Sequence, residues 1–136
     1  MIGWWTCGIF TEMNNLFLIA IGGALGSVSR YGCQRWIYQL HPHPFPFGTF
    51  AVNIVGSLLI GIFYAASEKG NLMSADWRLF LTTGFCGGFT TFSTFSFETI
   101  SLLREGNYAY AITYIVLSVL LGVLAVGAGI FVVKIL

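Results

Sequence analysis

The stretch Gly84-Phe85-Cys86-Gly87-Gly88-Phe89-Thr90-Thr91-Phe92-Ser93-Thr94-Phe95-Ser96-Phe97-Glu98 decides how this chain folds. It lies inside a long apolar segment, yet it combines glycines, hydroxyl side chains, phenylalanines and a carboxylate, unlike a helix that faces only lipid. The pair Gly87-Gly88 predicts a helix break, because glycine has the lowest helix propensity after proline. Broken helices at membrane depth persist only where they are buried in protein or line a polar cavity. We therefore expect the functional centre here.

The overall composition indicates an integral membrane protein. Of 136 residues, 57% are hydrophobic and only 8% are charged, and the mean hydropathy is +0.83. Soluble proteins carry about 25% charged residues. The net charge of +1 offers no surface for nucleic acid. Cys7, Cys33 and Cys86 are odd in number and scattered, which argues against a disulfide framework or a zinc site.

Apolar segments of about 20 residues predict membrane spans. Four such segments predict a single four-helix transmembrane domain, with spans at about 14–36, 47–67, 77–103 and 108–133. Residues 1–12 form a short apolar N-terminal extension, interpreted as a loose segment or an interfacial anchor. All three prolines lie between the first two spans, in a loop that also carries His41 and His43, which are expected to be exposed.

Small residues mark where helices should pack closely. Gly22 and Gly26 form a small-xxx-small face on the first span, and Ala125 and Gly129 form a similar pair on the fourth. Such faces let two helix backbones approach each other in the membrane.

Basic residues are balanced between the two ends of the predicted bundle. With alternating spans, three lie on each side: Lys69, Arg78 and Lys134 against Arg30, Arg35 and Arg104. Because orientation is normally set by an excess of Lys and Arg on one side, a balanced chain is expected to insert both ways. We therefore predict dual topology and an antiparallel homodimer, with its two-fold axis in the membrane plane.

Polar side chains inside the spans have two open interpretations. Thr49, Asn53 and Ser57 form one stripe on the second span. Asn53 is costly to bury without hydrogen bonds, so it is either a clamp between helices or part of a polar path. Phe92 and Phe95 are either a packing stripe or rings whose positive edges border the route of an anion.

Two charged residues in the spans, Glu98 and Arg30, also have two open interpretations each. Glu98 is either an interfacial carboxylate or a proton carrier. Arg30 either pairs with a backbone carbonyl or faces a water-filled vestibule that attracts anions.

Three motifs together resemble the Fluc fluoride channels, also called CrcB proteins. They are Gly22-Gly23-Ala24-Leu25-Gly26 with Arg30-Tyr31, Gly48-Thr49-Phe50-Ala51-Val52-Asn53-Ile54-Val55-Gly56, and the run from Thr83 to Ser96. The resemblance extends from about Met13 to the end and leaves residues 1–12 without a counterpart. It implies an antiparallel dual-topology dimer in the bacterial cytoplasmic membrane that exports fluoride passively through two pores.

The resemblance also implies roles for individual residues. The residues matching the fluoride pore are Asn53, Phe92, Ser93, Thr94, Phe95, Tyr114 and Ser118. Arg30 matches the vestibule arginine and Glu98 a pore-end glutamate. Gly87 and Thr90 match a helix break whose backbone carbonyls hold a structural sodium ion on the dimer axis. The expected partners are fluoride, membrane lipid and a second copy of the chain.

Two other classes of membrane protein remain as alternatives. A small dual-topology multidrug exporter also has four helices, but proton-coupled export needs a membrane-embedded carboxylate, and Glu98 is the only contender. A purely structural subunit would not explain the hydroxyl and amide stripes. An enzyme is not expected, because no nucleophile-base pair or metal cluster is evident.

Overall fold

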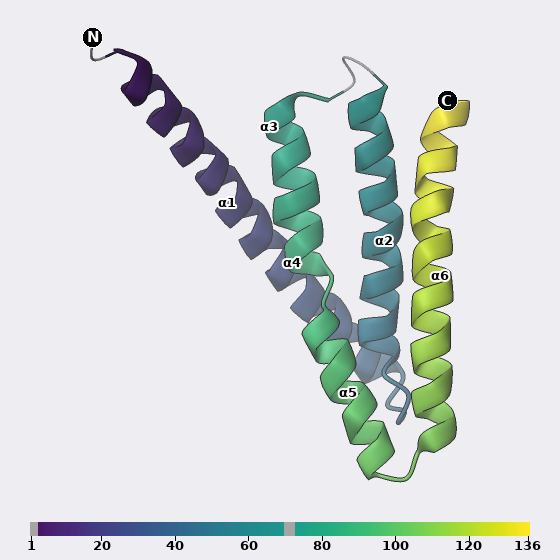
Figure 1. The fold of residues 1–136 in the computed structure, drawn as a ribbon. Helices are drawn as coiled ribbons and strands as arrows, with labels where there is room; N and C mark the ends of the chain where they lie inside the picture. Colours follow the sequence, from purple (N-terminus) through teal and green to yellow (C-terminus); the bar gives the residue numbers. More distant parts are fainter. Residues whose placement is uncertain (1–2, 70–72) are drawn as a thin grey trace.

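The computed structural model describes residues 3–69 and 73–136, and within them it contains helices and no β-strand (Figure 1). The helices are α1 (Gly3–Leu40), α2 (Phe47–Glu68), α3 (Ala75–Arg78), η1 (Leu79–Cys86), α4 (Gly87–Phe89), α5 (Phe92–Arg104) and α6 (Tyr108–Ile135). The segment η1 is π-helical, with a wider turn than an α-helix. The all-helical prediction is therefore confirmed.

Three of the described helices are long and apolar enough to cross a membrane: Met13–Leu40 of α1, α2 and α6. The predicted third span is instead assembled from α3, η1, α4 and α5. In Figure 1 these short elements run from the end of the molecule where the C-terminus lies to the opposite end, where α5 connects to α6. Successive segments thus alternate in direction.

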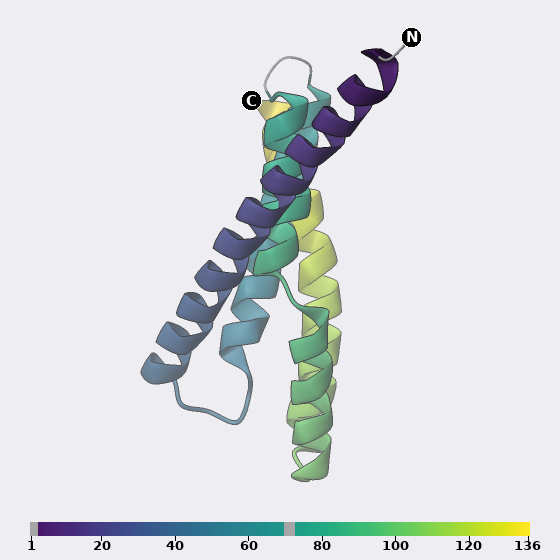
Figure 2. The ribbon, with the colours of Figure 1, turned by 90° about the vertical axis from the view of Figure 1, so that its left-hand side faces the viewer.

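The first helix is longer than expected. It begins at Gly3 rather than at about Asn14, so residues 3–12 of the predicted N-terminal extension continue α1. Met1 and Ile2 lie outside the described residues. At 1.5 Å per residue, the 38 residues of α1 span about 57 Å, against about 30 Å for the hydrocarbon core of a bilayer. In both ribbon views its N-terminal half diverges from α2 and α6 (Figures 1 and 2).

Glycines set the closest helix contacts, as the small-residue faces predicted. A methyl group at Gly26 would collide with the carbonyl oxygen of Phe85, so α1 lies directly on the backbone of η1. At the other side of the bundle, a methyl group at Gly129 would collide with the carbonyl oxygen of Leu58. Accordingly α6 packs most extensively against α2, and α1 against η1.

The interruption of the third span lies at Thr90 and Thr91, just beyond the predicted site at Gly87-Gly88. Thr90 (φ −84°, ψ 158°) and Thr91 (φ −151°, ψ 120°) are extended, whereas Gly87 is helical (φ −61°, ψ −38°). Gly88 serves close packing instead, because a methyl group there would collide with the carbonyl oxygen of Gly23 on α1.

The turn after α5 ends that helix in a Schellman motif. The N–H of Asn107 donates to the carbonyl of Leu102 at 2.8 Å, and the N–H of Gly106 donates to that of Leu103 at 3.2 Å. Gly106 has a φ of 78°, the left-handed conformation that this motif requires at the residue after the cap. The chain therefore reverses tightly into α6.

The apolar core lies at this end of the bundle. Phe45, Leu102, Ala111 and Tyr114 are buried together, with Phe50 and Phe95 packed against them. The core thus fixes the relative positions of α2, α5 and α6 just below the interruption in the third span.

Candidate functional site

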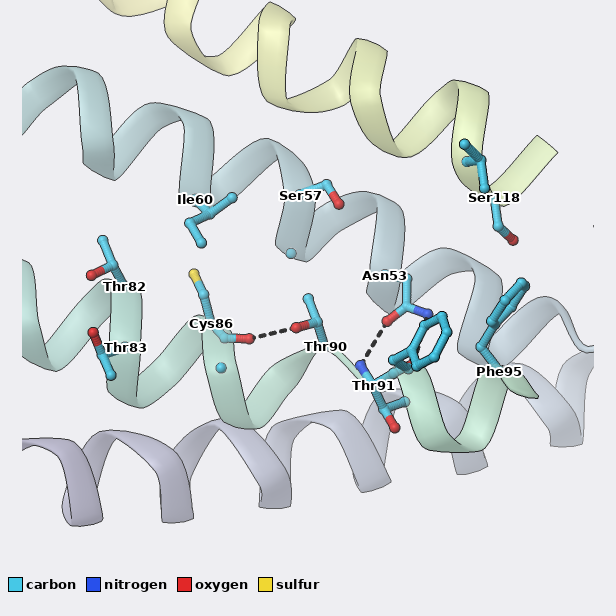
Figure 3. A pocket seen from close by; sticks show the side chains of 14 residues that line it. Asn53, Ser57, Ile60, Thr82, Thr83, Cys86, Thr90, Thr91, Phe95 and Ser118 are labelled. Atoms are coloured by element: carbon cyan, nitrogen blue, oxygen red, sulfur yellow. Dashed lines mark hydrogen bonds between the residues drawn. The ribbon is translucent and has the colours of Figure 1, made fainter. Parts of the chain in front are cut away.

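A side-chain amide from α2 holds the interruption of the third span. The N–H of Thr91 donates to Asn53 Oδ1 at 2.8 Å (Figure 3). In return, Asn53 Nδ2 donates to the carbonyl of Thr91 at 3.1 Å. Both backbone groups of an extended residue are thereby satisfied at membrane depth. Asn53 is a clamp between helices, as one of its two interpretations predicted, and its amide still has a second N–H to donate.

The clamp changes which backbone carbonyls are covered. In a continuous helix the carbonyl of Gly87 would accept from the N–H of Thr91, and the carbonyl of Thr90 from the N–H of Thr94. Here the first N–H goes to Asn53, and the second goes to Thr91 Oγ1 at 3.3 Å as a helix cap for α5. The carbonyls of Gly87 and Thr90 thus both lose their helical donor.

Arg30 covers one of the two carbonyls that lie between them in the chain. Its Nε donates to the carbonyl of Gly88 at 3.1 Å, and Ser27 Oγ contacts the same oxygen at 3.5 Å. The structure therefore confirms the pairing of Arg30 with a backbone carbonyl, one of its two predicted roles.

A cavity of about 590 Å³ opens beside the interruption, between α2, η1, α4, α5 and α6. This central pocket is lined by Asn53, Gly56, Ser57, Ile60, Thr82, Thr83, Cys86, Gly87, Thr90, Thr91, Phe92, Phe95, Ser118 and Val119. Ser118 Oγ is buried and has no hydrogen-bond partner within the described part of the chain. An unpartnered hydroxyl in a low-dielectric site is costly unless a ligand or water reaches it.

The two predicted pore phenylalanines both line this pocket but differ in burial. Phe92 is 79% exposed, whereas Phe95 is partly buried and packs against Tyr114 with ring centroids 4.9 Å apart. The centroids of Phe92 and Phe95 are 5.8 Å apart. Phe95 therefore both packs against Tyr114 and lines the central pocket. Within a single chain, Phe92 only lines the pocket.

A second cavity of about 340 Å³ lies under the loop between α1 and α2. This loop-side pocket is lined by Gln34, Ile37, Tyr38, His41, His43, Pro44, Phe45, Pro46, Phe47, Gly48, Thr49, Thr94 and Glu98. His41 and His43 are exposed, as expected. The two pockets are linked by hydroxyls, because Thr91 Oγ1 donates to Thr94 Oγ1 at 3.0 Å and contacts Ser93 Oγ at 3.3 Å.

Glu98 is held by donors from two other helices. Thr49 Oγ1 donates to Glu98 Oε1 at 2.7 Å, and the hydroxyl of Tyr114 donates to Glu98 Oε2 at 2.8 Å. Gln34 Nε2 in turn donates to Thr49 Oγ1 at 3.0 Å. Tyr114 is completely buried and lines neither pocket. In this chain its hydroxyl therefore fixes the carboxylate.

Gln34 and Ser27 were not predicted from the sequence as site residues. Both belong to α1, and they contact Thr49 and the carbonyl of Gly88. Both lie on the side of α1 that also carries Arg30, at positions 27, 30 and 34, a spacing that places them on one helix face. That spacing was the signal in the sequence that could have identified them.

No group of three His, Cys, Asp or Glu side chains in residues 3–69 and 73–136 could hold a metal ion.

Comparisons with known proteins agree on one family. Residues 17–130 match the family described as "CrcB-like protein, Camphor Resistance (CrcB)". A protein of Bacteroides fragilis named "Fluoride-specific ion channel FluC" is 56% identical over 86% of this chain and 94% of its own length. Proteins of the same name from Leptospira interrogans and Flavobacterium psychrophilum are 46% and 47% identical, over 88% and 90% of this chain and 94% and 98% of their own lengths.

The relatives carry the name of an ion channel, which confirms the prediction that this protein is not an enzyme. The family match and the high identity over most of the chain also confirm the resemblance drawn from the motifs. The chain belongs to the CrcB-like family of membrane proteins.

Proposed function

We propose that this protein is a fluoride-selective channel that lets fluoride leave the cell passively across the bacterial cytoplasmic membrane and so protects against fluoride toxicity. The observation that carries the proposal is the central pocket, where hydroxyls and an amide line a cavity at membrane depth and the buried Ser118 Oγ has no partner among the residues that the structure describes. The name of the relatives supports the choice of fluoride.

The chemistry of the lining suits a small, strongly hydrated anion. Such an ion enters a pore only if hydrogen-bond donors replace its water, and hydroxyl and amide groups do this without trapping it as fixed cations would. Asn53 of α2 has a second N–H to donate, and Ser118 of α6 has a hydroxyl without a partner in the described part of the chain; both residues line the pocket (Figure 3). The rings of Phe92 and Phe95 add positive edges beside them.

A route for the ion follows from the arrangement of the two pockets. Thr91 lines the central pocket, Thr94 lines the loop-side pocket, and their hydroxyls are hydrogen-bonded to each other. A fluoride ion moving between the pockets would pass along these hydroxyls, with Ser93 beside them. The loop-side pocket, with Glu98 in its wall, is then one mouth of the route.

A second, antiparallel copy would complete the pore. Phe92 is 79% exposed, and a methyl group placed at Gly87 would meet no atom within 4 Å. A pocket with polar groups is costly to leave open to lipid, and the open glycine lets a second helix backbone approach closely at this face. The balanced basic residues allow the two orientations that such a dimer needs.

The carbonyls of Gly87 and Thr90 suit a structural sodium ion on the axis of this dimer. Both have lost their helical donors, and two carbonyls from each copy would surround the cation with backbone oxygens. When bound, sodium would supply one positive charge between the two anion routes. The residues of this chain thus provide half of the coordination, with no charged side chain involved.

Anion efflux from liposomes that contain only this protein tests the proposal. We expect fast fluoride efflux and little chloride efflux under the same gradient. Equal rates for the two ions, or no fluoride efflux above that of empty liposomes, would refute it.

A further inference from the structure

Four helices meet in one chain of hydrogen bonds at the loop-side pocket. It runs from Gln34 on α1 to Thr49 on α2 at 3.0 Å, and from Thr49 to Glu98 on α5 at 2.7 Å. Tyr114 on α6 closes it by donating to the other carboxylate oxygen at 2.8 Å. Thr49 and Tyr114 are buried, with 2% and 0% of their surface exposed.

The direction of each bond in this chain is set by chemistry. An ionised carboxylate only accepts hydrogen bonds, so the single proton of the Thr49 hydroxyl must point to Glu98. The Thr49 oxygen can then only accept from Gln34, and the amide must present its NH₂ group. The amide proton on the Thr49 oxygen polarises that hydroxyl and so strengthens the hydrogen bond that it donates to the carboxylate.

We infer that Gln34 is a positioning residue for anion passage. By donating to Thr49 it strengthens the hydrogen bond from Thr49 to Glu98 and holds that carboxylate against the wall of the loop-side pocket, bound to α2 and α6. The inference rests on the proposed function, because it assigns a role at one end of the proposed fluoride route. A carboxylate released into that mouth would repel the anion.

The test uses Gln34→Met, which keeps the length of the side chain and removes its donor. Gln39→Met is the matched control, because Gln39 is exposed on the same helix and does not line the pocket. Thr49→Val keeps the shape of Thr49 and breaks the chain of bonds one step later. It serves as a second, independent variant if Gln34→Met folds poorly.

Infrared spectroscopy reports the hydrogen bonding of the carboxylate directly. The Glu98 band is identified by subtracting the spectrum of Glu98→Gln, in protein labelled with ¹³C-glutamate. We expect Gln34→Met and Thr49→Val each to shift this band, Gln39→Met to leave it in place, and Gln34→Met to add nothing in the Thr49→Val background. A purely structural role for Gln34 would not move the band of a residue that it does not touch.

Fluoride efflux provides the second measurement. We expect Gln34→Met to lower it about fivefold, the scale of losing one hydrogen bond between neutral groups, with Gln39→Met at the wild-type rate. The inference would be overturned if Gln34→Met left the Glu98 band unshifted, or if this variant released fluoride as fast as the wild-type protein. In either case the wild-type protein itself would still conduct fluoride. Failure of the proposed function would differ, because fluoride efflux would then be absent from the wild-type protein as well.

Discussion

Asn53→Asp tests how the clamp and the proposed pore share one side chain. The substitution is nearly isosteric and keeps the oxygen that accepts from the N–H of Thr91 at 2.8 Å. It replaces the Nδ2 group, which donates to the Thr91 carbonyl at 3.1 Å, by a second acceptor. Two oxygens then face each other across the interruption, and the donor available to an anion is lost.

The size of the effect follows from these contacts. Leaving the part-buried Thr91 carbonyl without its donor costs about 1–3 kcal/mol of folding free energy. The loss for transport should be larger, because the ionised carboxylate also repels fluoride in the central pocket. We expect fluoride efflux to fall by at least about tenfold, which corresponds to about 1.4 kcal/mol.

The assay compares fluoride efflux from liposomes with the thermal unfolding midpoint in detergent. Asn14→Asp is the matched control, because it makes the same atomic change at an exposed position of α1 outside both pockets, and it should match the wild type in both measurements. Wild-type efflux through Asn53→Asp would remove Asn53 from the proposed route. An unchanged unfolding midpoint would refute its role as a clamp.

Three further predictions address the dimer and the phenylalanines. Gly87→Ala should stabilise an isolated chain by up to about 1 kcal/mol, because the site is open and helical, yet weaken the dimer in a dissociation assay; a stabilised dimer would exclude this face. Phe92→Ile and Phe95→Ile should both cut fluoride efflux, but only the second should lower the unfolding midpoint, by roughly 1 kcal/mol of stability, because only Phe95 packs on Tyr114; normal efflux in both variants would make the rings mere packing. Two or three lysines added between residues 68 and 76 should abolish efflux until a chain biased the opposite way is co-expressed, and full efflux from the biased chain alone would rule out an obligate antiparallel pair.

Local signals were enough to locate two of the long helices. Hydropathy placed the second and fourth spans within two residues of α2 and α6, because a run of apolar residues between polar turns leaves no other low-energy arrangement in lipid. The small-residue faces also predicted contacts correctly, since only glycine permits the backbone approach seen at Gly26 and Gly129.

The position of the interruption depended on partners far away in the sequence. Glycine propensity pointed to Gly87-Gly88, but the extended residues are Thr90 and Thr91, because Asn53, 38 positions away, satisfies the backbone of Thr91 there. Gly88 stays helical because α1 lies against it. Propensity states how readily a helix can break, whereas the place of the break is decided by where replacement hydrogen bonds exist.

The sequence by itself therefore determined the class of protein, the approximate spans and the polar residues that had to matter, since these depend on composition and on spacing along one helix. Tertiary structure alone decided what each polar group does. It brought Asn53 to the backbone of Thr91, Arg30 to the carbonyl of Gly88 and Tyr114 to Glu98. It left the hydroxyl of Ser118 without a partner within residues 3–69 and 73–136. The physical reason is that a buried polar group takes the partner that packing brings within about 3 Å, and that distance is set by helices far apart in the chain.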